Sequence, residues 1–331
     1  MIRLFGLRDV LMVKQLQPQG VAFDLRWLLL HSTPPLHSAL AGYLTHYNLG
    51  TITCVHEGSS KEGRNLKGFA QVWPRPAQAE WDLVFLSPAL ERHERAADLW
   101  YRLLTYLSIL GAEQGILRIY ARCAEDAEAE DIFRQAGFTV VVREELFALR
   151  REPAAAPRPG NLRPLSAQDL RAVEELYRQA VPQLVQQVEG RPPAIGLARY
   201  RLPLGSRRGQ EHLWIEEGKV LAYMGWYSSP KGSWLEVVAR PEYRANALPG
   251  IKYVLSLTGC SETMPIYCPV PDYDVGLGWL LRTLGFEPCG RQVLLVRHTA
   301  ARVPVRHRLV VPGLERGVNV HTSVGNLSRI H

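Results

Sequence analysis

The stretch RPEYRANALPG, residues 240–250, contains residue types whose spacing suits phosphate binding. It lies between a strand-like segment, 233–239, and a helix-like segment, 247–259. At such a junction, the free N–H groups of the first helical turn and the positive end of the helix dipole favour an anion. Arg244 adds a cationic side chain, whereas Pro249 suits a first helical turn but lacks an N–H donor. The stretch therefore predicts an anion-binding turn with fewer backbone donors than usual.

Two sets of residues recur at nearly the same offset, which indicates an internal repeat. The first set has an offset of 153, and it matches Trp81, Val84 and Pro88 with Trp234, Val237 and Pro241. The second has an offset of 148, and it matches AEDIFRQAGF at 129–138 with LGWLLRTLGF at 277–286. Because both matches occur in the same order, the sequence predicts a duplicated domain.

A linker separates the two copies. Residues 151–160, REPAAAPRPG, are rich in Pro and Ala and have no periodic apolar positions. We therefore place an N-terminal domain at 1–150, a C-terminal domain at 161–300 and a basic extension at 301–331. The extension fits neither repeat, and its role can be packing on a domain, docking of a partner or contact with nucleic acid.

Strand-like and helix-like segments alternate in each half. In the first half, strands are expected at 78–87, 116–123 and 139–149, and helices at 96–111 and 128–138. In the second half, helices are expected at 167–181, 247–259 and 275–286, and strands at 212–228 (two, with a Glu-Gly turn), 233–239, 264–270 and 291–298. This order predicts an α/β (α+β) protein with a mixed twisted sheet flanked by helices in each domain.

The order of elements resembles the GNAT N-acetyltransferase superfamily, present twice, over residues 1–150 and 161–300. The resemblance implies that the strand before the turn and the next strand splay apart, with acyl-CoA in the gap. The pantetheine arm would then pair with the backbone of the first strand, here Val237, Val238 and Ala239. It also implies acetyl-CoA or another acyl-CoA as a substrate and no metal.

Both turns depart from the family's pyrophosphate pattern, Gln/Arg-x-x-Gly-x-Gly/Ala. In the second half, Arg244 stands at the first position, Ala247 and Pro249 at the glycine positions, and Gly250 one place later. In the first half, SPALERHERAADLW at 87–100 has no glycine and sets a glutamate between two arginines. The resemblance therefore implies degenerate cofactor loops in both halves, with the C-terminal half the more competent.

The resemblance also implies catalytic positions. A tyrosine five residues before the Phe of Gly-Phe often serves as general acid in the family, but Phe133 and Leu281 stand there. Tyr273 is the nearest substitute, and it can equally be structural. A carboxylate on the strand before the turn often serves as base, which points to Glu236 and, in the first half, Asp82. Each of these can also be an ordinary strand residue.

The formal net charge of +7 is uneven along the chain. Residues 1–150 contain 16 Lys and Arg against 17 Asp and Glu, so the remainder carries +8. A basic half favours anionic partners such as a nucleotide cofactor, an RNA or an acidic surface, although it also serves solubility alone. No apolar run reaches the length of a bilayer span, so no membrane partner is expected.

The five cysteines form no CxxC pair and no zinc-site spacing. Together with an N-terminus that makes a poor export signal, this predicts free thiols and a cytoplasmic protein. Cys260 or Cys268 as a nucleophile would need an activating base, which the sequence does not identify. Five aromatic residues of the second half can form an acceptor wall or core, namely Trp214, Tyr223, Trp226, Tyr227 and Trp234.

Three functional hypotheses follow. In the first, which we favour, the C-terminal domain is an acyl-CoA-dependent N-acyltransferase that acts on a primary amine of a small molecule or peptide. In the second, the chain is a catalytically inactive scaffold or binding protein. In the third, it takes its acyl group from an aminoacyl-tRNA, which makes nucleic acid the less favoured partner. The sequence identifies neither the acceptor nor the oligomeric state.

Overall fold

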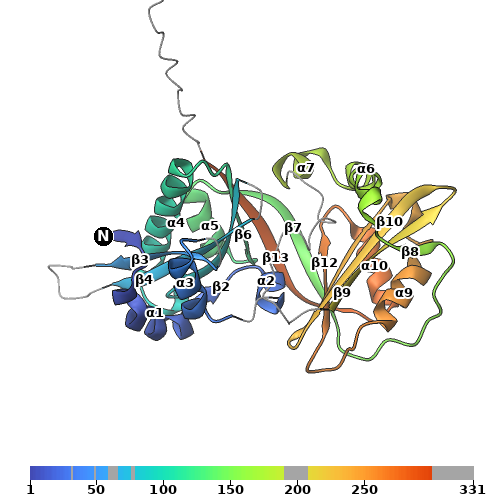
Figure 1. The fold of residues 1–331 in the computed structure, drawn as a ribbon, viewed down its shortest axis with the longest axis horizontal. Coiled ribbons are helices and arrows are strands. Elements are labelled where there is room, and N and C mark those ends of the chain that lie inside the picture. Colours follow the sequence, from blue (N-terminus) through green and yellow to red (C-terminus); the bar gives the residue numbers. More distant parts are fainter. Residues whose placement is uncertain (31–32, 48–49, 59–65, 76–78, 190–207, 300–331) are drawn as a thin grey trace, which may run out of the picture.

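The computed structural model describes the chain except residues 31–32, 48–49, 59–65, 76–78, 190–207 and 300–331 (Figure 1). One large mixed sheet runs through both halves and helices flank it, so the predicted fold class is confirmed. Two lobes meet where the strands β7 (Thr139–Leu149) and β13 (Glu287–His298) cross between them (Figure 1). The predicted extension, 301–331, lies outside the described residues, and the domain boundaries stay a prediction.

The N-terminal lobe begins with a short strand and ends with the long strand β7. Its other described strands are β1 (Ile2–Leu4), β2 (Val21–Ala22), β3 (Ile52–Glu57), β4 (Lys67–Pro74), β5 (Glu80–Ser87) and β6 (Arg118–Ala124). Its described helices are α1 (Val10–Leu16), α2 (Leu25–Leu30), α3 (Pro35–Leu44), α4 (Ala96–Glu113) and α5 (Ala127–Gln135).

The C-terminal lobe has a similar order of elements. Its described strands besides β13 are β8 (Leu162–Pro164), β9 (Arg208–Glu216), β10 (Lys219–Ser229), β11 (Gly232–Ala239) and β12 (Ile266–Pro271). Its described helices are α6 (Leu170–Ala180), α7 (Gln183–Glu189), α9 (Leu248–Ser256) and α10 (Val275–Thr283). The expected Glu-Gly turn joins β9 to β10, with Glu217 and Gly218 both at positive φ, as a tight hairpin requires.

The repeat seen in the sequence extends to the ends of its last helices. Asp126 caps α5 and Asp274 caps α10, because each carboxylate accepts a hydrogen bond from a backbone N–H three residues on. Past each helix, Gly137 and Gly285 adopt positive φ, which a glycine at this position allows without strain. The two copies therefore start and stop this helix with the same chemistry.

The last strand of each half is built into the other half. The sheet order is β1-β3-β4-β5-β6-β13-β7-β12-β11-β10-β9-β8, so β13 lies between β6 and β7, and β7 pairs with β12. As a result, Val293 and Leu295 from β13 belong to the core of the N-terminal lobe. Phe147 and Leu149 from β7 belong to the core of the C-terminal lobe. The lobes thus exchange strands and share one sheet.

Near its start, each half contains an arginine–aspartate pair with the same hydrogen bonds. Arg3 forms two hydrogen bonds to Asp9, at 2.5 and 2.6 Å, and Arg163 forms two to Asp169, at 2.7 and 2.6 Å. A backbone N–H three residues before each aspartate also donates to it. The pair ties the first strand of each lobe to the first helix, and it adds a further match to the repeat.

We expect Asp169→Asn to lower the free energy of unfolding at neutral pH by about 1 kcal/mol, since Arg163 is half exposed and solvent screens the pair. Hydrogen bonds from Arg163 outweigh burial and lower the pKa of Asp169 below its ordinary value. The stabilisation is therefore full above the pKa of an unfolded aspartate, about 4, and is lost as pH falls further. Urea unfolding between pH 3 and 7 checks this.

The difference between Asp169→Asn and the unaltered protein should shrink on acidification. Asp131→Asn is the matched control, because Asp131 pairs with Arg134 on the exposed face of α5 with a side chain that is 66% exposed. A gap in stability that stays constant down to pH 3 would show that the charge of Asp169 is not its source.

Candidate functional site

We call the gap between two diverging strands of the sheet a splay. In the N-terminal lobe, the splay between β5 and β6 is filled by a segment of the same lobe. Strands β5 and β6 are paired in parallel only over Glu80–Leu83, after which they diverge. Residues 16–24, which we call the plug segment, enter the gap. There β2 pairs with β5 through Val21–Leu86 and Ala22–Phe85, on the edge that β6 has left. The backbone that the family resemblance assigns to an acyl donor is thus already paired.

Hydrogen bonds hold the plug segment along its length. The Ser87 hydroxyl donates to the Leu16 carbonyl, and the N–H of Ala89 donates to the Gln19 carbonyl. At the other end, the N–H of Phe23 donates to Val84 on β5, and the N–H of Asp24 donates to Arg122 on β6. The backbone of Gly20 lies so close to β5 that a Cβ there would stand 2.4 Å from the Phe85 ring and 2.7 Å from the Leu86 carbonyl. The plug is therefore a tightly fitted part of the sheet.

Asp82, the base expected in the first half, is committed to an ion pair. Its two carboxylate oxygens accept hydrogen bonds from Arg75 at 2.8 and 2.6 Å, and both side chains are buried. Burial alone would raise the pKa of Asp82, but the charge and hydrogen bonds of Arg75 outweigh it and lower that pKa. A carboxylate held this way takes up a proton poorly, so the geometry gives Asp82 a structural role.

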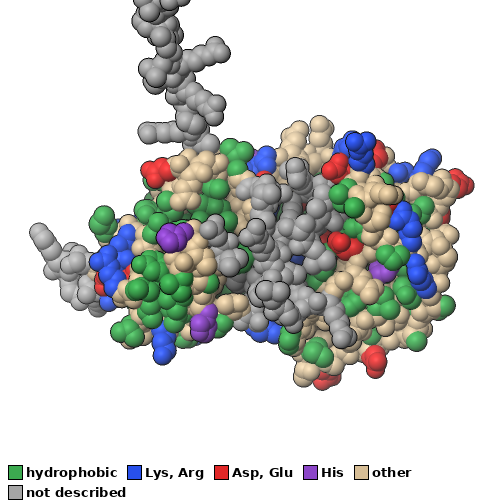
Figure 2. Space-filling model, in the orientation of Figure 1, with side chains coloured by type: hydrophobic (Ala, Val, Ile, Leu, Met, Phe, Trp, Pro, Cys, Tyr) green, Lys and Arg blue, Asp and Glu red, His purple; other side chains and the backbone are tan. Residues whose placement is uncertain are grey.

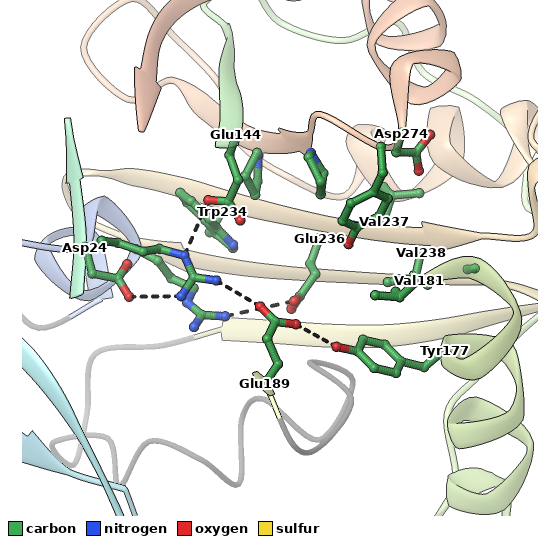
Figure 3. A pocket seen from close by; sticks show the side chains of 16 residues that line it. Asp24, Glu144, Tyr177, Val181, Glu189, Trp234, Glu236, Val237, Val238 and Asp274 are labelled. Carbon is green, nitrogen blue, oxygen red and sulfur yellow. Dashed lines mark hydrogen bonds and ion pairs between the residues drawn. The ribbon is translucent and has the colours of Figure 1, made fainter. Parts of the chain in front are cut away.

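The splay of the C-terminal lobe, in contrast, leads into a cavity. Strands β11 and β12 pair only through Ser233–Ile266 and Trp234–Tyr267 and then diverge. Beyond this point the described residues enclose a cavity of about 80 Å³ (Figure 3). Four of the expected site residues line it, namely Glu236, Val237, Val238 and Tyr273. Two residues far apart in sequence, the expected base and the expected acid, thus share one cavity.

Charged side chains from several elements form much of the remaining cavity wall (Figure 3). Arg122 from β6 has carboxylate oxygens of Glu144, Glu189 and Asp24 at 3.4, 3.5 and 3.8 Å. The Tyr177 hydroxyl donates to Glu189 at 2.6 Å. Such a network fixes the wall because each carboxylate is held by at least one donor.

Glu236 has a cation beside it from the other lobe. Arg26, in the first turn of α2, places Nη1 3.9 Å from Oε1 of Glu236, and both side chains are nearly buried. On β10, Gly225 lies opposite Glu236 in the strand register. The missing side chain at Gly225 leaves room for the hydroxyls of Tyr223 and Tyr227 to meet at 3.0 Å.

Tyr273 enters the cavity wall just before α10. Burial raises the pKa of its hydroxyl above the ordinary value, and nearby carboxylates add to this rise. The hydroxyl therefore keeps its proton at neutral pH. A protonated phenol at the edge of the cavity has the chemistry of a general acid, although its packing beside Tyr177 and Val181 also fits a structural role.

The turn after β11 uses several of its own donors. The N–H of Ala247 donates to the carbonyls of Tyr243 and Arg244, and the N–H of Leu248 donates to that of Ala245. Pro249 has no N–H to offer. The expected cradle of backbone amides thus lacks three donors, and the turn fits a pyrophosphate only through side chains and remaining N–H groups.

The expected cofactor residues of this turn face in different directions. Arg244 reaches across to Asp274, with Nε 2.8 Å from the carboxylate. Gly250 faces the core, where a Cβ would stand 3.0 Å from both Met224 and Trp214. Ala247 is fully buried, and Ala239 is buried where β11 pairs with β10. Packing thus explains Ala247 and Gly250, and their part in cofactor binding stays a prediction.

Sequence reasoning did not identify the second cation of this turn. Arg240 follows β11 directly, and its Nε is buried with no hydrogen-bond partner among the described residues. It also did not identify Asp24, Arg26 and Arg122, because these lie in the other half of the chain and no spacing pattern links them to Glu236. Only the fold brings the two sets together.

The remaining candidates have structural surroundings. Trp214 and Trp226 belong to the core of the C-terminal lobe, and of the five aromatic residues only Trp234 lines the cavity. Cys268 is fully buried and burial raises its pKa, which opposes a role as nucleophile. The described residues contain no group of three or more His, Cys, Asp or Glu that could hold a metal ion.

Two properties of the whole described part bear on partners. Among these residues, no helix is long and apolar enough to cross a membrane. On the face drawn in Figure 2, Lys and Arg side chains are scattered over both lobes with Asp and Glu between them. The residues described on that face form no continuous basic band, which is the usual path of a nucleic-acid backbone.

Comparison with known proteins shows the fold. No protein-family model matches the chain, and no curated protein matches its sequence. Among solved structures, a tandem GNAT protein from the clavulanic acid biosynthesis pathway is similar at 14% identity and a TM-score of 0.51, over 90% of this chain and 98% of that chain. A GCN5-related N-acetyltransferase from Sphaerobacter thermophilus is similar at 13% identity and a TM-score of 0.49, over 90% of this chain and 95% of that one. At such identities the likeness is one of fold, and the likeness to the tandem GNAT protein confirms the predicted GNAT fold.

Proposed function

We propose that this chain is an acyl-CoA-dependent N-acyltransferase whose chemistry takes place in the C-terminal lobe. The observation that carries the proposal is the contrast between the two splays. The N-terminal splay is filled by the plug segment, whereas the C-terminal splay opens on a cavity that holds Glu236 and Tyr273. We propose a short acyl group such as acetyl, because the room between these side chains is small, about 80 Å³.

The residues of the cavity have distinct roles in this reaction. Acyl transfer from a thioester needs a base for the amine and an acid for the departing thiolate. Glu236 takes the proton of the amine, directly or through water, and Tyr273 returns a proton to sulfur. The backbone of Val237 and Val238 holds the donor and the reacting groups in line, which replaces a bimolecular encounter by a positioned one. Because carboxylates outnumber arginines in the cavity wall, a primary amine that arrives as a cation is the fitting acceptor.

The pyrophosphate would depend on arginine side chains. Since Ala247, Leu248 and Pro249 offer no free amide, the anion needs Arg244 and Arg240. Arg244 is paired with Asp274, so it must exchange that carboxylate for a phosphate. This competition predicts weak binding, in the micromolar range or above, and it makes binding sensitive to the charge of Asp274.

Calorimetric titration with acetyl-CoA tests this proposal. We expect one saturable site per chain, since the plug segment leaves only one splay open. Arg244→Gln should weaken binding about tenfold, because a charge-assisted contact is worth roughly 1.5–3 kcal/mol and the turn is exposed. Asp274→Asn should tighten binding, because asparagine keeps the helix cap of α10 but releases Arg244.

The opposite signs of these two effects are the control for misfolding, since a damaged turn would weaken binding in both variants. Arg102→Gln, at an exposed pair on α4, should change nothing. No heat and no thermal shift up to millimolar acetyl-CoA would contradict the proposal. The second candidate, a catalytically inactive scaffold with this fold, would then be favoured. The Arg244–Asp274 pair and the internally bonded turn are the observations that support that candidate.

A further inference from the structure

The last residue of the plug segment is held in an uncommon backbone conformation. Asp24 has φ +63°, in the left-handed region, and is almost completely buried. Asp tolerates this region better than most residues, but it still costs free energy that the surroundings must supply. Here they do so, because the N–H of Asp24 donates to Arg122 and its carboxylate lies 3.8 Å from the Arg122 guanidinium. The chain is thus turned sharply at one fixed point.

Beyond that turn, the chain enters the other lobe. Helix α2 starts at Leu25 and contacts β10 and β11 of the C-terminal lobe. Leu29 packs there with Tyr227 and Trp234. One helical turn earlier, Arg26 is 7% exposed and points its guanidinium at Glu236. Only Leu25 therefore separates the last anchor of the plug segment, Asp24, from a cation that contacts the proposed base.

We infer that the plug segment is a positioning device, and that Arg26 is a positioning residue for Glu236. The inference rests on the proposed function. The N-terminal lobe closes its own splay with residues 16–24, and the same residues fix where Arg26 lies in the site of the C-terminal lobe. The residues that fill the gap in one copy of the repeat therefore also hold a part of the site in the other copy.

The electrostatics of the cavity explain why Glu236 needs this cation. Four carboxylates share the cavity wall with Glu236 and disfavour a further negative charge there, namely Asp24, Glu144, Glu189 and Asp274. The hydroxyls of Tyr223 and Tyr227 and the thiol of Cys268 lie near enough to Glu236 to interact with it electrostatically, and Tyr273 lines the same wall. Arg26, 3.9 Å from Glu236, opposes the four carboxylates, and Arg122 lies farther along the same wall. Removal of Arg26 therefore takes away one positive charge that favours the ionised form of Glu236 and one contact that orients it.

Kinetics of Arg26 variants test the inference. For Arg26→Gln we expect kcat at pH 7 to fall about tenfold while KM for acetyl-CoA stays within about twofold, and the acid limb of the pH–rate profile to move up by about one unit. Arg26→Lys should recover part of both losses, because it restores the charge without the planar guanidinium. Arg102→Gln is the control for loss of a surface arginine. A lower unfolding midpoint with unchanged kcat and an unmoved acid limb would overturn the inference.

Displacing the plug segment should change the kinetics in the same direction as Arg26→Gln does, although the Arg26 side chain is unaltered. Gly20→Ala puts a Cβ into the Phe85 ring and the Leu86 carbonyl, so the segment must shift away from β5. Gly160→Ala is its control, because nothing lies within 4 Å of a Cβ there. We expect Gly20→Ala to lower kcat and move the acid limb as Arg26→Gln does, and Gly160→Ala to do neither. If Gly20→Ala keeps the kinetics of the unaltered protein, the plug segment does not position Glu236 and the inference is wrong.

A readout without catalysis separates this inference from the proposed function. In urea unfolding, Arg26→Gln and Glu236→Gln should be less damaging together than the sum of their single effects, since each substitution alone already removes the same Arg26–Glu236 contact. In the Gly20→Ala background this coupling should shrink. If the protein shows no acyl transfer but keeps the coupling, the proposed function fails and the positioning of Arg26 on Glu236 stands. Additive effects of the two substitutions would overturn the inference.

Discussion

Replacing Glu236 by glutamine is expected to lower kcat for acetyl transfer by about 10²- to 10⁴-fold at neutral pH, the usual contribution of a positioned general base. Glutamine keeps the size of the side chain and its acceptor oxygen but cannot take a proton. Because Val237, Val238 and the turn remain in place, KM for acetyl-CoA should change little. Steady-state kinetics with a panel of primary amines, combined with the acetyl-CoA titration, measure both quantities.

The pH dependence of the Glu236→Gln variant makes the test sharper. A carboxylate base gives the unaltered protein an acid limb in its pH–rate profile, and this limb should disappear in the variant. The residual rate should rise with pH, because only amines that are already deprotonated can then react. Glu242→Gln is the matched control, since Glu242 lies exposed in the turn that follows β11. A variant that keeps both rate and acid limb would assign the base to another group.

The parts of the fold that sequence patterns predicted are those that local chemistry determines. The helices at 128–138 and 275–286 were recognisable by their apolar spacing and their Gly-Phe endings, and each ends at a glycine with positive φ. The Glu-Gly turn was predictable because its two residues, Glu217 and Gly218, form a local turn at positive φ. In the site, the family resemblance pointed to Glu236 and Tyr273, and these two residues do line one cavity.

The parts that sequence patterns missed depend on contacts between distant segments. Nothing in VAFDLR, residues 21–26, distinguishes a strand that fills its own lobe's splay from an ordinary loop. The role of Arg244 as a phosphate-binding cation stays a prediction, and its pairing with Asp274 depends on the distance between two loops. Asp82 and Glu236 occupy equivalent strands, but Arg75 holds Asp82 with two hydrogen bonds, whereas Arg26 lies 3.9 Å from Glu236. Spacing along a chain carries no information about such partners.

Strand exchange was not predictable from the sequence either, because it pairs segments that lie far apart along the chain. Residues 1–158 expressed alone are expected not to fold, although they contain one complete copy of the repeat. In the whole chain, β13 fills the space between β6 and β7 with four buried side chains, Val293 to Val296. At roughly 1.5–3 kcal/mol for each buried side chain, their removal costs about 6–12 kcal/mol, which is comparable to the entire stability of an ordinary domain, about 5–15 kcal/mol.

The fragment is destabilised in a second way, because its own last strand, β7, is left without its partner strands β12 and β13. Phe147 and Leu149 of β7 are buried in the C-terminal lobe, and without that lobe they would face water. Backbone NMR spectra and far-UV circular dichroism of the fragment should therefore show an unfolded or aggregating chain. Co-expression with residues 159–331 should restore a folded complex that elutes with the full-length protein.

The intact chain should unfold in one transition whether followed by tryptophan fluorescence or by circular dichroism, because one sheet joins both cores. A fragment 1–158 with dispersed NMR signals and cooperative unfolding would mean that β7 can move into the place of β13, and that the two lobes are separable after all.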